Sequence, residues 1–255
     1  MNILISNDDG VYADGIKALY RELRKEHSVT VVAPLEERST TGHTLSLDVP
    51  LRLVEVEKDI YGCSGFPADC SLVGFGHILK SKPDLVISGI NRGANLGQDI
   101  YYSGTMAAAR EASFHGIPSI AVSSACNFMD PNLTHINFDV AANFILRLLR
   151  VVEPKSIAPL TVLNINVPDV SAEKIRGVQV TELGFRKYSE EISERVDFKG
   201  RSYYWVGGKY EGFIGESGTD CHAVDQNFIS VSPLNLLGGS SDQIEEWTKI
   251  LKNLK

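Results

Sequence analysis

The sequence predicts an α/β fold built on a doubly wound, mostly parallel sheet. Two observations support this: apolar strand-like runs alternate with helical patterns over the first 124 residues, and polar or glycine-rich segments follow several of the strands. A chain of 255 residues can bury roughly 70–75% of its unfolded surface in one large core. We therefore expect one large domain with an excursion rather than two equal domains.

The first elements form a strand–helix–strand unit. Asn2–Ser6 is a short apolar run, Gly15–Lys25 has helical spacing, and Ser28–Ala33 is β-branched and stops at a proline. This order implies a parallel pair of strands with a right-handed crossover. The following segment, Thr44–Val56, alternates in the manner of antiparallel strands.

The next segments continue the α/β pattern to residue 124. We expect helices at Pro67–Leu79 and Gly104–His115, and strands at Asp84–Ile90 and Ile117–Ser123. A polar, glycine-rich loop, Asn91–Ser103, connects the strand that precedes it to the second of these helices.

The pattern changes in the second half. Phe138–Val152 predicts an amphipathic helix and Thr161–Val167 a strand, so residues 1–124 and roughly 138–170 form the expected core. From about residue 176 to 231 the pattern favours strands and turns. Tyr203–Val206 precedes two glycines, which indicates a hairpin arm, and Asp242–Leu254 predicts a helix.

This excursion, roughly residues 176–255, has little apolar surface with which to bury itself. The C-terminal helix carries one apolar stripe, and the arm is short and aromatic. We expect both to form a subunit interface, and the alternative is packing on the chain's own core. The residues of the helical stripe are Ile244, Trp247, Leu251 and Leu254.

Composition excludes several classes of protein. The formal net charge of −7 argues against a nucleic-acid-binding surface, although a bound divalent ion would still allow a small anionic substrate. We find no run of about 18 apolar residues to span a membrane and no basic, apolar leader. The four cysteines form no C-x-x-C pair, so we expect reduced thiols and a cytoplasmic protein.

Two adjacent acids, Asp8 and Asp9, end the first strand. Neighbouring carboxylates repel each other, and a bound cation would relieve that repulsion at the edge of a sheet where ligands bind. Gly10 permits the turn that both side chains need to face one cleft. The alternative is an ordinary turn in which one of the two acids caps the following helix.

Two further oxygen donors follow neighbouring strands. Ser39 lies just past the second strand and Asn91 directly follows Asp84–Ile90. Hydroxyl and amide oxygens suit Mg²⁺, Mn²⁺ or Ca²⁺. A loop serine alone is more often plain surface, and a lone asparagine more often belongs to a turn.

A candidate anion site lies at the start of a helix. Ser103-Gly104-Thr105 combines free backbone N–H groups, a helix dipole and a glycine that lets a phosphate approach closely. The alternative is a simple helix cap. Carboxylate, hydroxyl and amide oxygens beside an anion cradle suit metal-dependent hydrolysis of phosphate esters.

At this point the chain resembles the SurE family, the stationary-phase survival protein E family of 5′-nucleotidases. The resemblance covers nearly the whole chain in order. It rests on Asn7-Asp8-Asp9-Gly10, Val32-Ala33-Pro34, Glu37-Arg38-Ser39, Pro67-Ala68-Asp69-Cys70, Ser88 to Gly97, Tyr102-Ser103-Gly104-Thr105, Asn164-Ile165-Asn166, Thr219-Asp220 with Ala223-Val224, and Ser230 to Leu234.

The resemblance implies a Rossmann-like three-layer αβα sandwich with a protruding β-hairpin and a C-terminal helix used in oligomerisation, as a homodimer or homotetramer. It implies hydrolysis of nucleoside 5′-monophosphates, and also of 3′-nucleotides and short polyphosphate. One divalent cation per subunit is expected, Mg²⁺ or Mn²⁺ with Ca²⁺ as a further alternative. Asp8, Asp9, Ser39 and Asn91 match the metal ligands, Asn95, Ser103, Gly104 and Thr105 match the phosphate-binding positions, and the catalytic set is Asp8, Asp9, Asn91 and Asn95.

The sequence departs from the family at one position near this motif set. Phe66 stands where the family commonly has Thr or Ser before Pro-Ala-Asp-Cys. The change removes a hydroxyl near the cleft and offers an aromatic face in its place. Asp69 could act near the site or at a helix start, and His43 could transfer a proton or belong to a lid.

A regulatory reading competes with the enzyme. A receiver-like or nucleotide-binding module could also hold Mg²⁺ at an acidic pair after its first strand, without turnover. A receiver needs a phospho-accepting Asp after another strand, whereas this chain has Pro34 and Asn91 at the corresponding strand ends. An aspartyl-phosphate phosphatase would need acids two residues apart.

Overall fold

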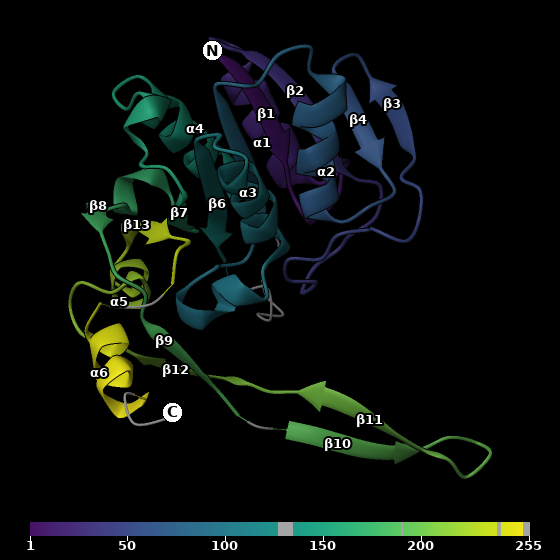
Figure 1. The fold of residues 1–255 in the computed structure, drawn as a ribbon, viewed down its shortest axis with the longest axis vertical. Coiled ribbons are helices and arrows are strands. Elements are labelled where there is room, and N and C mark those ends of the chain that lie inside the picture. The colour runs from purple at the N-terminus through teal and green to yellow at the C-terminus, as the bar shows by residue number, and fades with distance from the viewer. Residues whose placement is uncertain (127–134, 190, 239–240, 252–255) are drawn as a thin grey trace.

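The computed structural model describes residues 1–126, 135–189, 191–238 and 241–251, and its centre is one large mixed sheet (Figure 1). Among these residues, nine strands form the sheet in the order β3-β4-β2-β1-β5-β6-β7-β13-β8. This confirms the predicted α/β class. The strands are β1 (Asn2–Ser6), β2 (Ser28–Pro34), β3 (Leu53–Glu57), β4 (Ile60–Cys63), β5 (Leu85–Arg92), β6 (Ser119–Ala125), β7 (Thr161–Pro168), β8 (Gly177–Val180) and β13 (Phe228–Asn235).

The chain reverses its direction across the sheet at β1. It first moves from β1 to β2 on one side and later enters β5 on the other, and β1 pairs in parallel with both. Strands β6 and β7 continue the parallel order. In open α/β sheets, ligands bind outside the carboxyl ends of the strands at such a reversal, which here lies between β1 and β5.

Helices cover both faces of the sheet and make the three layers that the sequence predicts (Figure 1). Ile3 and Ile5 of β1 belong to the core on the side of α1 and α4, whereas Leu4 points to the opposite core with Cys70 of α2. The helix α3 packs beside α2 on that second face. The helices are α1 (Asp14–Leu23), α2 (Pro67–Val73), α3 (Gly104–Phe114), α4 (Phe138–Leu149), α5 (Asp220–Asp225) and α6 (Ser241–Leu251).

Three segments differ from the sequence prediction. Only the last part of Thr44–Val56 forms a strand, and its antiparallel partner β4 lies outside the predicted range. The predicted helix Pro67–Leu79 continues from α2 into a π-helix, Gly74–Ile78. The prediction that Asn91 follows its strand is wrong, because β5 continues to Arg92 through an irregularity between Ser88 and Asn91.

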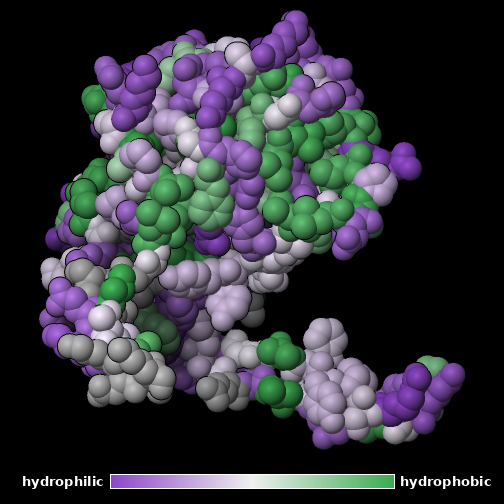
Figure 2. Space-filling view, in the orientation of Figure 1, coloured by the Kyte–Doolittle hydropathy of each residue, from purple (hydrophilic) through white to green (hydrophobic). Residues whose placement is uncertain are grey.

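The predicted hairpin arm is present and projects away from the sheet (Figures 1 and 2). At its base β9 (Phe185–Tyr188) pairs with β12 (Tyr210–Ile214), and further out β10 (Glu191–Val196) pairs with β11 (Ser202–Gly207). The turn lies at residues 197–201, where the Asp197 carboxylate accepts the backbone N–H groups of Lys199 and Arg201 at 2.8 and 3.0 Å. The two glycines after Val206 thus lie at the base of the outer ribbon rather than at its turn.

The C-terminal part contains one helix that the sequence pattern did not indicate, α5, which is only six residues long. The predicted terminal helix forms as α6 and ends at Leu251 in the described range, so the predicted stripe residue Leu254 lies outside the described residues. No helix in the described part of the chain combines the length and apolar character needed to cross a membrane.

Candidate active site

A tight turn after β1 positions the two acids. The Asn7 side chain donates to the Gly10 carbonyl at 2.9 Å and accepts the Gly10 N–H at 3.2 Å. Gly10 adopts φ +101°, a conformation that side chains disfavour. The chain therefore bends between the acids and the start of α1, as the sequence predicts, and the acids lie at the carboxyl end of the central strand.

Asp8 is buried against the start of α3. Its Oδ1 accepts the Thr105 hydroxyl at 2.5 Å, and the exposed fraction of the residue is 4%. Gly104 makes the contact possible, because a Cβ there would lie 2.7 Å from the Cβ of Asp8. Burial, together with the charge of Asp9, raises the pKa of Asp8 to about 7, although hydrogen bonds from Thr105 oppose the shift.

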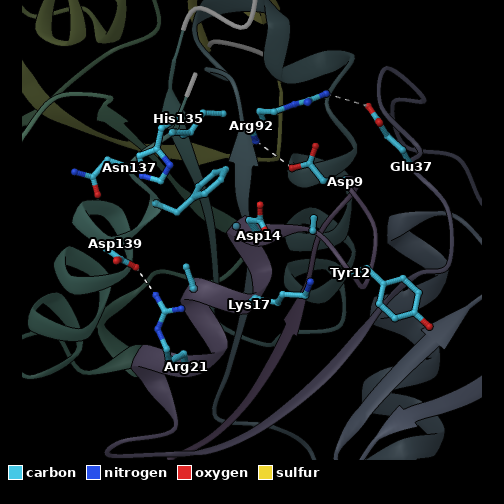
Figure 3. Close-up of a pocket in the computed structure, with 15 residues that line it drawn as sticks. Asp9, Tyr12, Asp14, Lys17, Arg21, Glu37, Arg92, His135, Asn137 and Asp139 are labelled. Atoms are coloured by element: carbon cyan, nitrogen blue, oxygen red, sulfur yellow. Dashed lines mark hydrogen bonds and ion pairs between the residues drawn. The ribbon is translucent and has the colours of Figure 1, made fainter. Parts of the chain in front are cut away.

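Asp9 faces different neighbours. Its Oδ2 accepts the backbone N–H of Arg92 at 3.0 Å, which connects the end of β1 to the end of β5. Burial raises the pKa of Asp9, while the hydrogen bond and charge of Arg92 oppose the shift. Asp9 also lines a cleft of about 760 Å³ beside α1, to which Lys17 and Asn137 contribute (Figure 3).

The other two candidate metal ligands lie near the acids but their side chains bind elsewhere. The Ser39 hydroxyl donates to Glu37 Oε1 at 2.8 Å and is exposed. The Asn91 amide donates to the Gly93 carbonyl at 2.8 Å, which leaves its oxygen to serve as an acceptor. The Ser39 loop is held to the site through the backbone, since the Arg38 N–H donates to the Asp8 carbonyl at 2.8 Å.

Three of the predicted phosphate-binding residues, Ser103, Gly104 and Thr105, form the start of α3. Ser103 caps the helix by accepting the Met106 N–H at 3.0 Å. The helix-cap reading of this segment is confirmed, and the phosphate-binding reading stays a prediction. The two are compatible, because a capped helix start still directs its dipole and its remaining free N–H groups outward. Ser103, Gly104 and Thr105 are all buried.

Asn95 is held by inward-facing amides of β7. Its backbone N–H donates to Asn166 Oδ1 at 2.8 Å, and its carbonyl accepts from Asn164 and Asn166 at 2.9 and 3.0 Å. Its side chain donates to the Ser123 hydroxyl at 2.9 Å. The sequence marks Asn164 and Asn166 only as part of a motif. Two asparagines alternating in a buried strand are the signal that could have indicated their contacts with the Asn95 backbone.

A second buried acid orders the same loop. Asp220 accepts the backbone N–H groups of Gly97, Gly184 and Cys221 at 2.7–2.8 Å. The loop Asn91–Ser103 is thereby joined to the start of the arm. The sequence marks Thr219-Asp220 only as a motif, and the contact spans 123 positions, so no local pattern could reveal it.

The structure also places Asp69 and His43. Asp69 Oδ2 accepts the Phe66 N–H at 2.8 Å and its Oδ1 accepts the Ser46 N–H at 2.9 Å, so it caps α2 and fixes the preceding loop. The His43 ring nitrogen Nε2 lies 2.8 Å from the Glu111 carboxylate of α3, so α3 holds the loop that carries His43. This contact is six residues along the chain from Thr105.

The residues at the end of β1 suit a divalent cation. Both acids have raised pKa values, so the protein alone disfavours their charged forms, and a cation would favour them. Two carboxylates, a hydroxyl and an amide oxygen are hard ligands of the kind that Mg²⁺ and Mn²⁺ take. In the described part of the chain, no group of three or more His, Cys, Asp or Glu residues is arranged to hold a metal, and this set contains only two such residues.

Comparisons with known proteins identify the family. The family model described as "Survival protein SurE" matches residues 3–190. The chain belongs to the SurE family. It is similar to the 5′-nucleotidase SurE of Geobacter sulfurreducens, with 48% identity over 236 residues that cover 92% of this chain and 88% of the relative.

Two further SurE proteins extend this similarity over the full length. The 5′-nucleotidase SurE of Thermosynechococcus vestitus is 41% identical over 269 residues, which cover 100% of this chain and 99% of that one. The crystal structure of the SurE protein from Aquifex aeolicus superposes with a TM-score of 0.85 at 37% identity, covering 99% of this chain and 100% of that one. The SurE resemblance inferred from the motifs is confirmed, and so is the αβα fold.

Proposed function

We propose that this chain is a 5′-nucleotidase that hydrolyses nucleoside 5′-monophosphates to nucleoside and phosphate, with one divalent cation per subunit. One observation carries the proposal: the start of α3, which suits a phosphate, lies directly against the buried acid Asp8 through Thr105. The names of the SurE relatives support the same activity.

The cation would be held by Asp8 and Asp9, with Ser39 and Asn91 as the neutral ligands. Ser39 would have to turn from Glu37 toward the acids, a rotation that its exposed position allows. A divalent ion, Mg²⁺ or Mn²⁺ and alternatively Ca²⁺, supplies positive charge to phosphoryl oxygens and lowers the pKa of a water.

The remaining residues bind the phosphate and accept the proton of the attacking water. Asn95, Ser103, Gly104 and Thr105 surround the phosphoryl oxygens, where negative charge develops in the transition state. Their positions are fixed in advance by β7 and by the α3 cap, so little reorganisation is needed during the reaction. Asp9 faces the open cleft and is our candidate to accept the proton of the attacking water, with Asp8 as the alternative.

A phosphate-release panel tests this function. The purified chain is supplied with nucleoside 5′-monophosphates, nucleoside 3′-monophosphates or short polyphosphate, each with Mg²⁺, Mn²⁺ or EDTA. We expect release from the 5′-monophosphates that EDTA abolishes, and we propose release from the other two classes as well. Turnover that survives chelation would contradict the metal, and a folded chain without turnover on any substrate would favour the regulatory alternative.

We further propose that the chain forms a homodimer or homotetramer through the arm and α6. Large apolar side chains on both elements are exposed, which is unfavourable for an isolated chain in water. Examples are Trp205 at 61% and Ile192 at 71% on the arm, and Trp247 at 58% on the helix. Light scattering that shows a monomer at working concentration would contradict the interface.

A cytoplasmic location completes the proposal. All four cysteines are free thiols in the structure, which agrees with a reducing compartment. Labelling of the thiols in freshly lysed cells tests it, because four reduced thiols per chain are expected.

A further inference from the structure

We propose that Arg38 is a further substrate-binding residue, whose guanidinium binds phosphoryl oxygens while the Phe66 ring holds its plane. This inference rests on the proposed function, since it names a new contact to the same phosphate.

Arg38 contacts the site through its backbone, and Phe66 is next to a residue that contacts the site. A Cβ on Gly104 would lie 2.7 Å from Asp8 Cβ and 3.0 Å from Pro67 Cγ, so the starts of α2 and α3 converge on Asp8. Phe66 directly precedes Pro67. The Arg38 N–H donates to the Asp8 carbonyl at 2.8 Å, so Arg38 leaves the backbone beside the same acid.

The guanidinium is stacked but has few polar partners. Its central carbon lies 5.3 Å from the centre of the Phe66 ring, which fixes the plane of the group. Its Nε is buried and has no hydrogen-bond partner among the described residues. Its ion pair with Glu36 is long, at 3.4 Å, and the Glu36 side chain is exposed. A buried N–H without an acceptor is costly, and an anionic ligand would supply one.

Charge balance favours a further positive group beside the bound phosphate, and the Arg38 guanidinium could supply it. Two carboxylates and a divalent cation sum to zero charge, whereas a phosphate monoester carries up to two negative charges. Arg92, the other arginine near the acids, already faces Glu37 at 4.0 Å on the side of Asp9. The Arg38 guanidinium is stacked on Phe66, and Pro67, the next residue, approaches Gly104 of the proposed phosphate site. A guanidinium suits paired hydrogen bonds to phosphate.

The test compares phosphate affinity in matched variants of the cation-loaded chain. We would measure the Kd of inorganic phosphate by calorimetry, and KM and kcat for a nucleoside 5′-monophosphate, in wild type, Arg38→Met, Arg38→Lys and Phe66→Leu. Arg38→Met should raise the phosphate Kd and KM by about tenfold to a hundredfold, the range for a charge-assisted hydrogen bond. Arg38→Lys should recover part of the loss, because it keeps the charge without the planar fork. Phe66→Leu should raise Kd several-fold.

Arg176→Met is the matched control. The Arg176 guanidinium lies 4.8 Å from the centre of the Phe228 ring, a similar stacked pair near β8 and β13. Its phosphate Kd and KM should stay within about twofold of wild type.

The outcomes separate this inference from the proposed function. A folded Arg38→Met chain with wild-type phosphate Kd overturns the role of Arg38, and so does a wild-type chain that binds no phosphate. If wild type binds phosphate without turnover, the nucleotidase proposal fails while the Kd series still decides on Arg38. If Arg38→Met does not fold, the Arg38→Lys and Phe66→Leu values decide, and unchanged Kd in both contradicts the contact.

Discussion

The carboxyl edge of the sheet and the arm differ in which side chains they bury and which they expose. At the sheet edge, polar groups are buried and paired, as the Asp8 carboxylate is with Thr105 and the Asn95 backbone with Asn166. On the arm, large apolar groups are exposed, Phe198 at 93% and Val206 at 85% among them. Buried acids at the sheet edge and exposed apolar groups on the arm are both unfavourable for an isolated chain. We propose a cation and a phosphate as the ligands of the sheet edge, and a second copy of the chain as the partner of the arm.

The difference also concerns how each region is held. The site loop is fixed by distant elements, through β7 and through Asp220 of α5, which favours a preorganised site. Within the described residues, the two strands of the outer arm pair only with each other, as a two-stranded ribbon. A two-stranded ribbon is marginally stable alone in water. We therefore expect changes at the sheet edge to alter catalysis, and changes on the arm to alter assembly.

The largest effect should come from Asp8→Asn. The amide keeps the shape and the acceptor for Thr105 but loses the charge that holds the cation. Turnover of a nucleoside 5′-monophosphate should fall by about a thousandfold or more, the scale of losing a metal that stabilises the transition state. Initial-rate assays check this, and circular dichroism confirms the fold. Activity within tenfold of wild type would remove Asp8 from the site.

The same variant should change how the stability of the cation-free chain depends on pH. Burial and Asp9 raise the Asp8 pKa from 3.8 to about 7, so the folded state binds that proton more tightly than the unfolded state. Its contribution to stability is full below about pH 4 and is lost as pH rises through about 7. A pKa difference of one between the folded and unfolded states corresponds to about 1.36 kcal/mol, so the contribution is several kcal/mol at most.

Urea unfolding in EDTA at pH 5 and pH 8 measures this dependence. Relative to wild type, Asp8→Asn should gain more stability at pH 8 than at pH 5. If the stability difference between Asp8→Asn and wild type is the same at both pH values, the pKa of Asp8 is not raised by folding. Burial of Asp8 would then not favour a bound cation.

A smaller effect is expected from Asn166→Leu. The change leaves the Asn95 N–H without its acceptor in a buried place, which should cost about 1–3 kcal/mol of unfolding free energy. Without this acceptor the Asn95 backbone shifts and displaces the Asn95 side chain from the proposed phosphate site. We therefore expect kcat to fall by about tenfold or more. The matched control is Asn143→Leu on α4, whose exposed side chain bonds only within its own helix. Equal kinetics in the two variants would contradict the positioning role.

The smallest effect on catalysis should come from the arm. Trp205→Glu adds a charge to a surface that we assign to a second copy, so the assembly should dissociate into smaller species while turnover per chain stays within about twofold. Light scattering and initial rates measure both. A wild-type assembly that survives this change places the interface elsewhere, and a large loss of turnover would show that the arm also supports the site.

The sequence allowed prediction of the local features of the fold. Strongly patterned segments such as Asn2–Ser6 and Gly104–Phe114 formed almost as expected, because their apolar spacing agrees with the surfaces they bury. Thr44–Arg52 did not become a strand. The alternation there did not decide the outcome, because the Ser46 backbone N–H donates instead to the side chain of Asp69, in a helix further along the chain.

The candidate site shows the same limit. The acids and the α3 start could be predicted, because each is a short motif at a strand end or a helix start. The groups that hold them could not, since Asn166, Asp220 and the Arg38–Phe66 stack act across the fold. The bulge in β5 that moves Asn91 into the strand is a property of sheet pairing, which no single segment encodes.

The most direct measurement is Mn²⁺ binding to the metal-stripped chain, followed by electron paramagnetic resonance. We predict one tightly bound ion per chain, lost in Asp8→Asn and Asp9→Asn and kept in Asn143→Leu. We also predict that inorganic phosphate changes the spectrum of the bound ion. An ion that binds with undiminished affinity to both acid variants, or no bound ion in a chain that still hydrolyses nucleotides, would contradict these predictions.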